Sequence, residues 1–253
     1  MQLYLTVTPG DLPGAGGFGV RMAHVAYRIG PGSVLLRQNL LLRTQGGLLT
    51  LSDVDAPAIG RPEQLARQIW QECGLRGYSG VLADFESAPT DDRTALLVRL
   101  RAILQANRRR LYVPEVYGPR VPGATVVICT ALSGGSFRQR LQEAADRWGA
   151  GHVALDVQRL IMDFPLPSPT GEGTPLTAPE LEKLREELQP SAFYSRDLCA
   201  RYFTYTQNGK SHFVVFDDAD TMRKKIQTGS AMGFPAAFLT YPEVKDLLRD
   251  ILA

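Results

Sequence analysis

The sequence lacks the uninterrupted run of about 18 apolar residues that a membrane-spanning helix needs, so we expect no transmembrane segment. Its charges nearly cancel, since 28 Lys and Arg stand against 26 Asp and Glu. The resulting net charge of +2 gives no broad positive surface for nucleic acid or an anionic membrane. Residues 1–9 lack the basic start and the long apolar stretch of a signal peptide. These features predict a protein that binds neither nucleic acid nor membranes and that stays inside the cell.

Residue types that commonly hold metals are also scarce. The three cysteines, Cys73, Cys129 and Cys199, are widely spaced and form no CxxC pair, so we interpret them as reduced, mostly buried thiols. The three histidines are too scattered for a zinc motif. A GxGxxG pattern at 14–19 has neither a convincing helix after it nor an acid about 20 residues on, where a ribose would require one. We therefore predict no metal and no cofactor, and we interpret 14–19 as a loop.

Short β-branched or apolar segments alternate with segments of helical period along most of the chain. This alternation is typical of successive βα units and a parallel sheet. Strands are expected at 3–8, 47–52, 80–85, 111–116, 125–130, 153–156 and 236–240, with a further strand or hairpin within 24–43. Helices are expected at 62–73, 91–107, 137–148, 178–188, 218–229 and 242–252. For 253 residues this pattern predicts one α/β domain over 1–253, a (β/α)8 TIM barrel, with a doubly wound open sheet as the alternative.

One segment near the C-terminus departs from the alternation. Two β-rich stretches at 201–206 and 212–216 flank Asn208-Gly209, and Asn-Gly is a strong hairpin signal. A loop rich in Pro, Ser, Thr and Gly, at 165–175, precedes the helix before this hairpin. We therefore predict a small α+β hairpin insertion at about 190–217 that decorates the barrel mouth.

The most informative segment is an apolar strand that ends in two acids. Because side chains alternate along a strand, Leu82, Asp84 and Glu86 point to the same side. If Leu82 faces the barrel interior, both carboxyl groups lie at the C-terminal mouth, where barrel enzymes keep their active sites. Two close acids tend to leave one of them protonated, which is what a general acid needs. The alternative is that Asp84 caps the next loop and Glu86 is solvated.

Residues 79–86, with the sequence SGVLADFE, resemble the DxxDxDxE strand of glycoside hydrolase family 18, the chitinase-like (β/α)8 barrels. Residues 200–218 resemble the small α+β insertion of that family, most closely in the bacterial spore-cortex and peptidoglycan branch. The resemblance implies that Glu86 is the general acid and that Asp84 orients the 2-acetamido group of the substrate, which attacks the anomeric carbon. The likeness to the spore-cortex branch adds the spore to the cytoplasm as an expected location.

This chain departs from the family pattern at several positions. The first two acids of the motif correspond to Ser79 and Leu82, so we expect Asp84 to ionise more easily than in the family. The tyrosine and acid of a later strand correspond to either Thr130-Ala131 or Phe164-Pro165. The family's tryptophan on the last strand is absent, and Phe238 and Tyr241 are the nearest aromatic residues.

The predicted function is hydrolysis, by substrate-assisted catalysis, of β-linked glycans that contain N-acetylglucosamine, chitin-like or peptidoglycan. The departures above are of the kind that impair this activity. A silent glycan-binding barrel is the main alternative, and a barrel that serves protein interaction alone is a third. The sequence leaves the oligomeric state open. The candidate substrate-binding residues are Glu115, Tyr117, Asp163, Phe164 and Tyr241.

Overall fold

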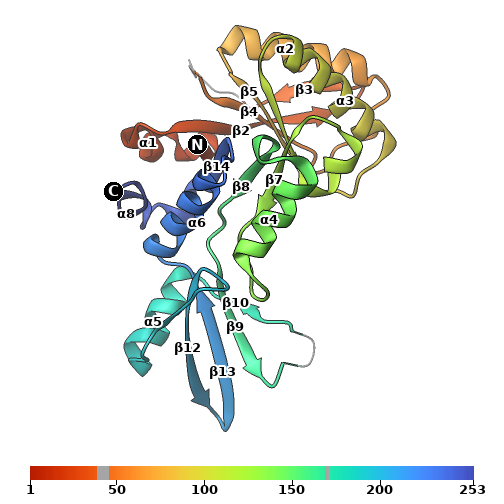
Figure 1. Ribbon diagram of the computed structural model, residues 1–253. Helices are drawn as coiled ribbons and strands as arrows, with labels where there is room; N and C mark the ends of the chain where they lie inside the picture. The colour runs from red at the N-terminus through yellow and green to blue at the C-terminus, as the bar shows by residue number, and fades with distance from the viewer. Residues whose placement is uncertain (39–45, 169–170) are drawn as a thin grey trace.

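A computed structural model describes residues 1–38, 46–168 and 171–253. Its larger sheet has nine strands, of which eight run parallel and one, β3, is antiparallel. The parallel strands follow one another in the order β1, β2, β4, β5, β6, β7, β8 and β14, and pairing of β14 with β1 closes the ring. This closure confirms the predicted (β/α)8 barrel and excludes the open doubly wound sheet (Figure 1).

The barrel strands coincide closely with the apolar segments of the sequence. Their bounds are β1 Gln2–Val7, β2 Arg21–Gly30, β4 Leu48–Ser52, β5 Gly80–Asp84, β6 Arg110–Pro114, β7 Thr125–Cys129, β8 Val153–Asp156 and β14 Ala236–Thr240. The uncertain segment at 24–43 forms a hairpin, in which β2 pairs with β3, Val34–Arg37. The remainder of that segment lies outside the described residues.

Helices cover the barrel unevenly. The long ones are α2 Pro62–Arg76, α3 Asp91–Ala106, α4 Phe137–Trp148 and α6 Ala219–Ala231. Short turns, α1 Leu12–Ala15 and η2 Gly16–Phe18, occupy the place of a first helix, so the glycine-rich pattern at 14–19 folds as helical turns. The C-terminal helix is split into α7 Tyr241–Val244 and α8 Leu248–Leu252, and η3 Glu115–Arg120 replaces a helix after β6.

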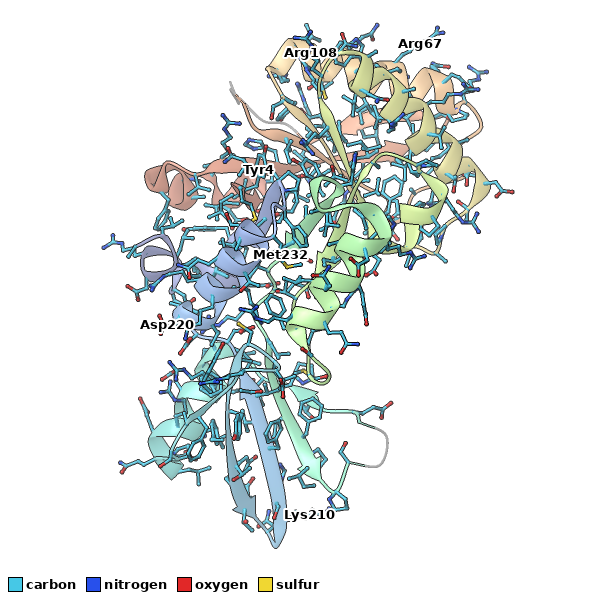
Figure 2. The ribbon with its side chains drawn as sticks, viewed as in Figure 1. Tyr4, Arg67, Arg108, Lys210, Asp220 and Met232 are labelled. Carbon is cyan, nitrogen blue, oxygen red and sulfur yellow. The ribbon has the colours of Figure 1, made fainter. Side chains whose placement is uncertain are left out.

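The insertion is larger than the sequence indicated. It begins at β9, Ile161–Leu166, and continues through β10 Thr174–Pro175, α5 Ala178–Leu188, β11 Phe193–Ser195, β12 Ala200–Gln207 and β13 Lys210–Phe216. These strands form an antiparallel sheet in the order β10, β9, β13, β12, β11. The predicted hairpin is present as β12 and β13, and Figure 1 shows the sheet projecting from the barrel, with Lys210 at its far tip in Figure 2.

Two apolar cores meet at the barrel wall. The larger one lies between strands and helices and includes Val81 and Ala83 of β5. A second core fills the barrel interior, where Tyr4, Tyr112 and Phe238 pack together and Leu82 contacts them from its edge. Consecutive residues of β5 therefore alternate between these cores, which places Leu82 and Asp84 on the interior face as predicted. Among the described residues, no helix is long and apolar enough to cross a membrane.

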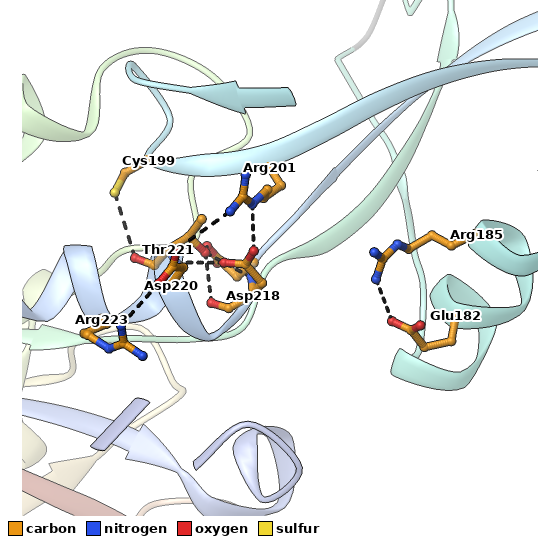
Figure 3. Close-up of polar contacts among 9 residues, drawn as sticks. Glu182, Arg185, Cys199, Arg201, Asp218, Asp220, Thr221 and Arg223 are labelled. Carbon is orange, nitrogen blue, oxygen red and sulfur yellow. Dashed lines mark hydrogen bonds and ion pairs between the residues drawn. The ribbon is translucent and has the colours of Figure 1, made fainter. Parts of the chain in front are cut away.

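The end of the insertion is fastened to the barrel by charged groups. Lys225 of α6 donates to the Asp217 carboxylate over 2.7 Å, and both side chains have an exposed fraction of 0%. The Leu160 N–H also donates to Asp217, so this pair joins the start and the end of the insertion. On the surface beside it, Arg201 of β12 pairs with Asp218 at the N-terminus of α6 (Figure 3).

Candidate functional site

A cavity of about 450 Å³ opens at the C-terminal ends of the barrel strands. Its walls come from all around the barrel, including Thr6 of β1, Val25 of β2, Val127 of β7 and Thr240 of β14. The chemically active groups in the wall are Asp84, Glu115, Cys129, Asp156 and Gln158. We call this hollow the mouth cavity. It lies where the C-terminal face of a (β/α)8 barrel carries its active site.

Asp84, the last residue of β5, stands in the wall of the mouth cavity. The side chain reaches solvent through the open mouth, while the barrel walls keep water away from its other sides. This desolvation raises the pKa of the Asp84 carboxyl, and the nearby charges of Glu86 and Asp53 raise it further. The Asp84 carboxyl is therefore harder to ionise than a free aspartate, even though the family's inner acid is missing here.

Glu86 lies at the rim of the same cavity, two residues beyond the end of β5. It is exposed, and it is close enough to Asp84 for their charges to interact, although it does not line the cavity wall. The Glu86 N–H donates to Asp53 Oδ1 over 2.8 Å. The strand and the following loop therefore bring Asp84 and Glu86 to one place, with Glu86 on the solvent side.

The loop that carries Glu86 is held by Asp53, a buried acid that follows β4. Besides the Glu86 N–H, Asp53 accepts a hydrogen bond from the Ser87 hydroxyl and pairs with Arg93 of α3 at 3.0 Å. The side chains of Asp53 and Arg93 are only 1% and 12% exposed, so water competes little for this pair. Asp53 thereby fixes the backbone from which the Glu86 side chain extends.

Asp156, at the end of β8, is a second acid in the wall of the mouth cavity. The pKa of the Asp156 carboxyl is raised to about 6, mainly by burial. The Gln158 amide, which donates to the carboxylate over 2.7 Å, lowers the pKa, whereas the charges of Glu243 and Asp84 raise it. In the sequence, Asp156 is one of several acids near predicted strand ends. Acids in such positions commonly cap loops or form ion pairs on the surface. Only the closed barrel brings it into one cavity with Asp84.

Asp156 makes the stability of the fold depend on pH. Its folded-state pKa of about 6 lies above the unfolded value of about 3.9, so the free energy of unfolding should fall as pH rises from about 4 to 6. We expect Asp156→Asn to raise the free energy of unfolding by about 1–2 kcal/mol at pH 7 and to change it little at pH 4. Urea unfolding at both pH values measures the difference.

A matched control is Asp146→Asn on the exposed side of α4, where Gln142 donates to the carboxylate. We expect this substitution to change the free energy of unfolding by less than about 0.5 kcal/mol at either pH. An equal gain for Asp156→Asn at pH 4 and pH 7 would show that its carboxyl does not titrate as described.

The structure places the five predicted substrate-binding residues differently from one another. Glu115 lines the mouth cavity and pairs with Arg140 of α4. Tyr117 is 0% exposed, packs edge to face against Phe85, and donates to the Ser87 carbonyl, so it supports the Glu86 loop from beneath. This burial corrects the expectation that Tyr117 faces the substrate.

Asp163 and Phe164 lie on β9 of the insertion and do not line the mouth cavity. Asp163 accepts a hydrogen bond from Tyr205 and contacts His212, while the buried Phe164 packs among strands of the insertion. The expectation for these two residues is corrected, because β9 belongs to the antiparallel sheet.

Tyr241 is also outside the cavity wall. It begins α7 just beyond the end of β14, and its ring packs edge to face against Phe18. Phe238, the other aromatic of this region, does line the cavity, and it stacks on Tyr4 with a centroid distance of 5.5 Å. Phe238 and Phe85 therefore supply the aromatic surface in the wall of the mouth cavity.

A larger groove of about 990 Å³ adjoins the mouth cavity, because Gln158 lines both hollows. It runs between the barrel rim at Pro242 and Glu243 and the insertion at Ile161, Leu176 and Ala178. A polymer that entered the mouth cavity would have room to continue along this groove. The insertion thus forms one wall of this groove.

No protein-family model and no curated protein matches the sequence. Several solved structures match the whole barrel. They include a chitinase from Chromobacterium violaceum (14% identity, TM-score 0.72, 100% of this chain and 99% of that one). A glycoside hydrolase family 18 chitinase from Cycas revoluta, in complex with (GlcNAc)4, matches at 10% identity and a TM-score of 0.68, over 99% and 98% of the two chains.

The spore cortex-lytic enzyme SleL from Bacillus megaterium is a further match, at 14% identity and a TM-score of 0.67, over 98% of this chain and 73% of that one. At these identities the likeness concerns the fold. It confirms, at the level of the fold, the predicted resemblance to the chitinase-like barrels.

Proposed function

We propose that this chain is a divergent family 18 glycoside hydrolase that cleaves β-linked glycans containing N-acetylglucosamine. The observation that carries the proposal is the position of Asp84 in the wall of the mouth cavity with Glu86 at its rim. Asp84 ends the strand that resembles the family's acidic motif, and Glu86 follows two residues later. The chitinase and cortex-lytic names of the structural neighbours support the same class of substrate.

In the proposed reaction, Glu86 donates its proton to the glycosidic oxygen as the bond from that oxygen to the anomeric carbon breaks. The carbonyl oxygen of the sugar's own acetamido group bonds to the anomeric carbon and forms a cyclic oxazolinium ion. Asp84 holds the acetamido N–H and stabilises its positive charge. Water then attacks the anomeric carbon, its proton passes to Glu86, and the ring opens again. This route needs no enzymatic nucleophile, but it needs an N-acetylated sugar.

Asp156 is our candidate for a group that compensates for part of what the family pattern loses. Thr130 and Ala131, one of the two candidate matches to the family's tyrosine and acid, follow β7, while Asp156 ends the neighbouring strand and lines the same cavity as Asp84. With a pKa of about 6, its carboxyl is partly protonated in mildly acidic solution and then donates a hydrogen bond. We propose that it binds the acetamido group or an adjacent hydroxyl.

The second candidate function is a glycan-binding barrel without hydrolytic activity. The replacement of inner acids by Ser79 and Leu82 favours it, because the proton relay behind Glu86 is shortened. Ser79 donates instead to the carbonyls of Gly46 and Gly47, which gives it a structural role. In this alternative the glycan still binds in the groove, but it is not cleaved.

The proposal is tested by offering the protein a tetramer of N-acetylglucosamine and the same tetramer without acetyl groups. Hydrolysis of the acetylated tetramer should be faster by at least about 100-fold, because only its acetamido group supplies the internal nucleophile. Product release is followed by mass spectrometry, with a peptidoglycan fragment run in parallel to separate the chitin-like substrate from the cell-wall one. Equal rates would contradict substrate assistance, whereas binding of the acetylated tetramer without cleavage would favour the silent barrel.

A further inference from the structure

A third hollow, of about 630 Å³, lies on the flank of the barrel between α4, α6 and the β11 region of the insertion. It is distinct from the mouth cavity and shares none of its lining residues. Tyr194 of β11 lines it, whereas the groove beside the mouth cavity is lined by residues of β9 and β10. Because β10 and β11 are the two edges of the insertion sheet, the two hollows lie at its opposite edges.

Three cationic side chains from separate segments converge on this hollow. Arg138 comes from the first turn of α4, Arg196 from the turn after β11, and Lys224 from α6. All three are exposed, and none forms an ion pair with an acid in the described part of the chain. No Asp or Glu is among the described residues that line the hollow. We call it the basic hollow.

Neighbouring arginines on this side of the protein form ion pairs with acids. Figure 3 shows Arg201 paired with Asp218 and Arg223 paired with Asp220, both at the N-terminal end of α6. The cations of the basic hollow stand close by on α4, α6 and the insertion and have no such partners among the described residues. Their positive charge is therefore left for a ligand.

The segment that carries Arg196 is anchored on both sides. The Phe137 N–H of α4 donates to the Asp197 carbonyl over 2.7 Å, and the buried thiol of Cys199 lies 3.9 Å from the Thr221 carbonyl of α6. Lys224 Nζ lies 4.4 Å from the centre of the Tyr194 ring. Such anchoring keeps the three cations near one another without a bound ligand, which lowers the cost of ordering them.

The remaining lining residues add hydrogen-bond donors and an apolar side. Gln142, Gln227 and Thr228 supply amide and hydroxyl groups, while Phe137 and Met232 supply apolar surface. Figure 2 labels Met232 at the end of α6, between the barrel and the insertion. Burial and the Cys199 thiol raise the pKa of the Tyr194 phenol to about 12, so it stays neutral near pH 7 and leaves the cations uncompensated.

We propose that the basic hollow binds a small anion with at least two phosphate or carboxylate groups. Three cations from three segments match more than one negative charge, and arginine binds planar or tetrahedral oxyanions through paired hydrogen bonds. The amides of Gln142 and Gln227 would contact the remaining oxygens. This site does not depend on the glycosidase proposal, because it shares no residue with the mouth cavity.

The test is calorimetric titration of the full chain with pyrophosphate and, separately, with citrate at low ionic strength. We expect saturable binding of at least one of the two, with a Kd of about 1 mM or tighter that weakens as salt is added. Binding of pyrophosphate alone assigns the phosphate class, and binding of citrate alone assigns the carboxylate class. Absence of saturable binding for both would overturn the proposal.

The double substitution Arg138→Gln/Arg196→Gln should weaken binding by at least about tenfold. Its matched control, Arg67→Gln/Arg108→Gln, removes the same charge from the end of the barrel farthest from the insertion (Figure 2). Equal weakening by both pairs would show that only the net charge matters and would overturn the site. Lys224→Gln, an exposed substitution on the surface of α6, should also weaken anion binding. All three variants should hydrolyse the glycan at the wild-type rate.

Discussion

Replacing Glu86 by glutamine should lower the rate of hydrolysis of an N-acetylglucosamine tetramer by a factor on the order of 10² to 10⁴. The amide has nearly the shape of the carboxyl group, but it does not release a proton to the glycosidic oxygen. Glu86 is exposed at the rim, and its backbone N–H rather than its side chain bonds to Asp53. The substitution should therefore leave the loop and the fold intact.

Initial rates for wild type and Glu86→Gln give this ratio directly. Glu143→Gln on the exposed side of α4 makes the same chemical change at a carboxylate that accepts a hydrogen bond from Gln139, away from the mouth cavity, and it should leave the rate unchanged. If Glu86→Gln hydrolysed the tetramer as fast as wild type does, Glu86 would lose its assignment as the acid. Unchanged thermal unfolding of both variants shows that a slower rate does not come from unfolding.

The largest expected effect on stability belongs to Lys225. Replacing it by methionine should lower the free energy of unfolding by about 3–5 kcal/mol, because the Asp217 carboxylate stays buried without its cation. The Leu160 N–H and the Thr221 hydroxyl still donate to Asp217, but neither carries a charge that balances it. Urea unfolding measured by circular dichroism gives the difference.

Two further variants separate this explanation from a simple packing defect. Adding Asp217→Asn to Lys225→Met removes the unpaired charge and keeps an acceptor for the Leu160 N–H, so it should restore part of the lost stability. Lys183→Met breaks the exposed pair with Glu187 and should cost less than about 1 kcal/mol. A loss below about 1 kcal/mol for Lys225→Met itself would mean that the buried pair contributes little.

The barrel could be predicted because each of its strands is a short apolar segment with local signals on both sides. Local signals also placed one helix of the insertion, since the capping box of Thr177 and Glu180 at the start of the helix at 178–188 is present in the structure. The extent of the insertion could not be predicted in the same way. Residues 161–166 form β9 mainly by pairing with β13, some 50 residues later, with the short β10 on the other side, and Pro165 indicated a loop in the sequence.

The candidate site, too, could be predicted only in part from the sequence. Alternation within one strand was enough to place Asp84 on the interior face beside Leu82. The position of Asp156 depends on how β8 is staggered between β7 and β14, which no local pattern encodes. Tyr117 was misplaced for a related reason, because η3 turns its ring beneath the Glu86 loop instead of toward the opening.

The most direct test of the central claim is a crystal structure of Glu86→Gln soaked with the N-acetylglucosamine tetramer. We expect a sugar ring in the mouth cavity, with its acetamido group within hydrogen-bond distance of Asp84 and with further rings along the adjoining groove. A tetramer bound only elsewhere on the protein, or an empty mouth cavity at a saturating concentration, would contradict the account.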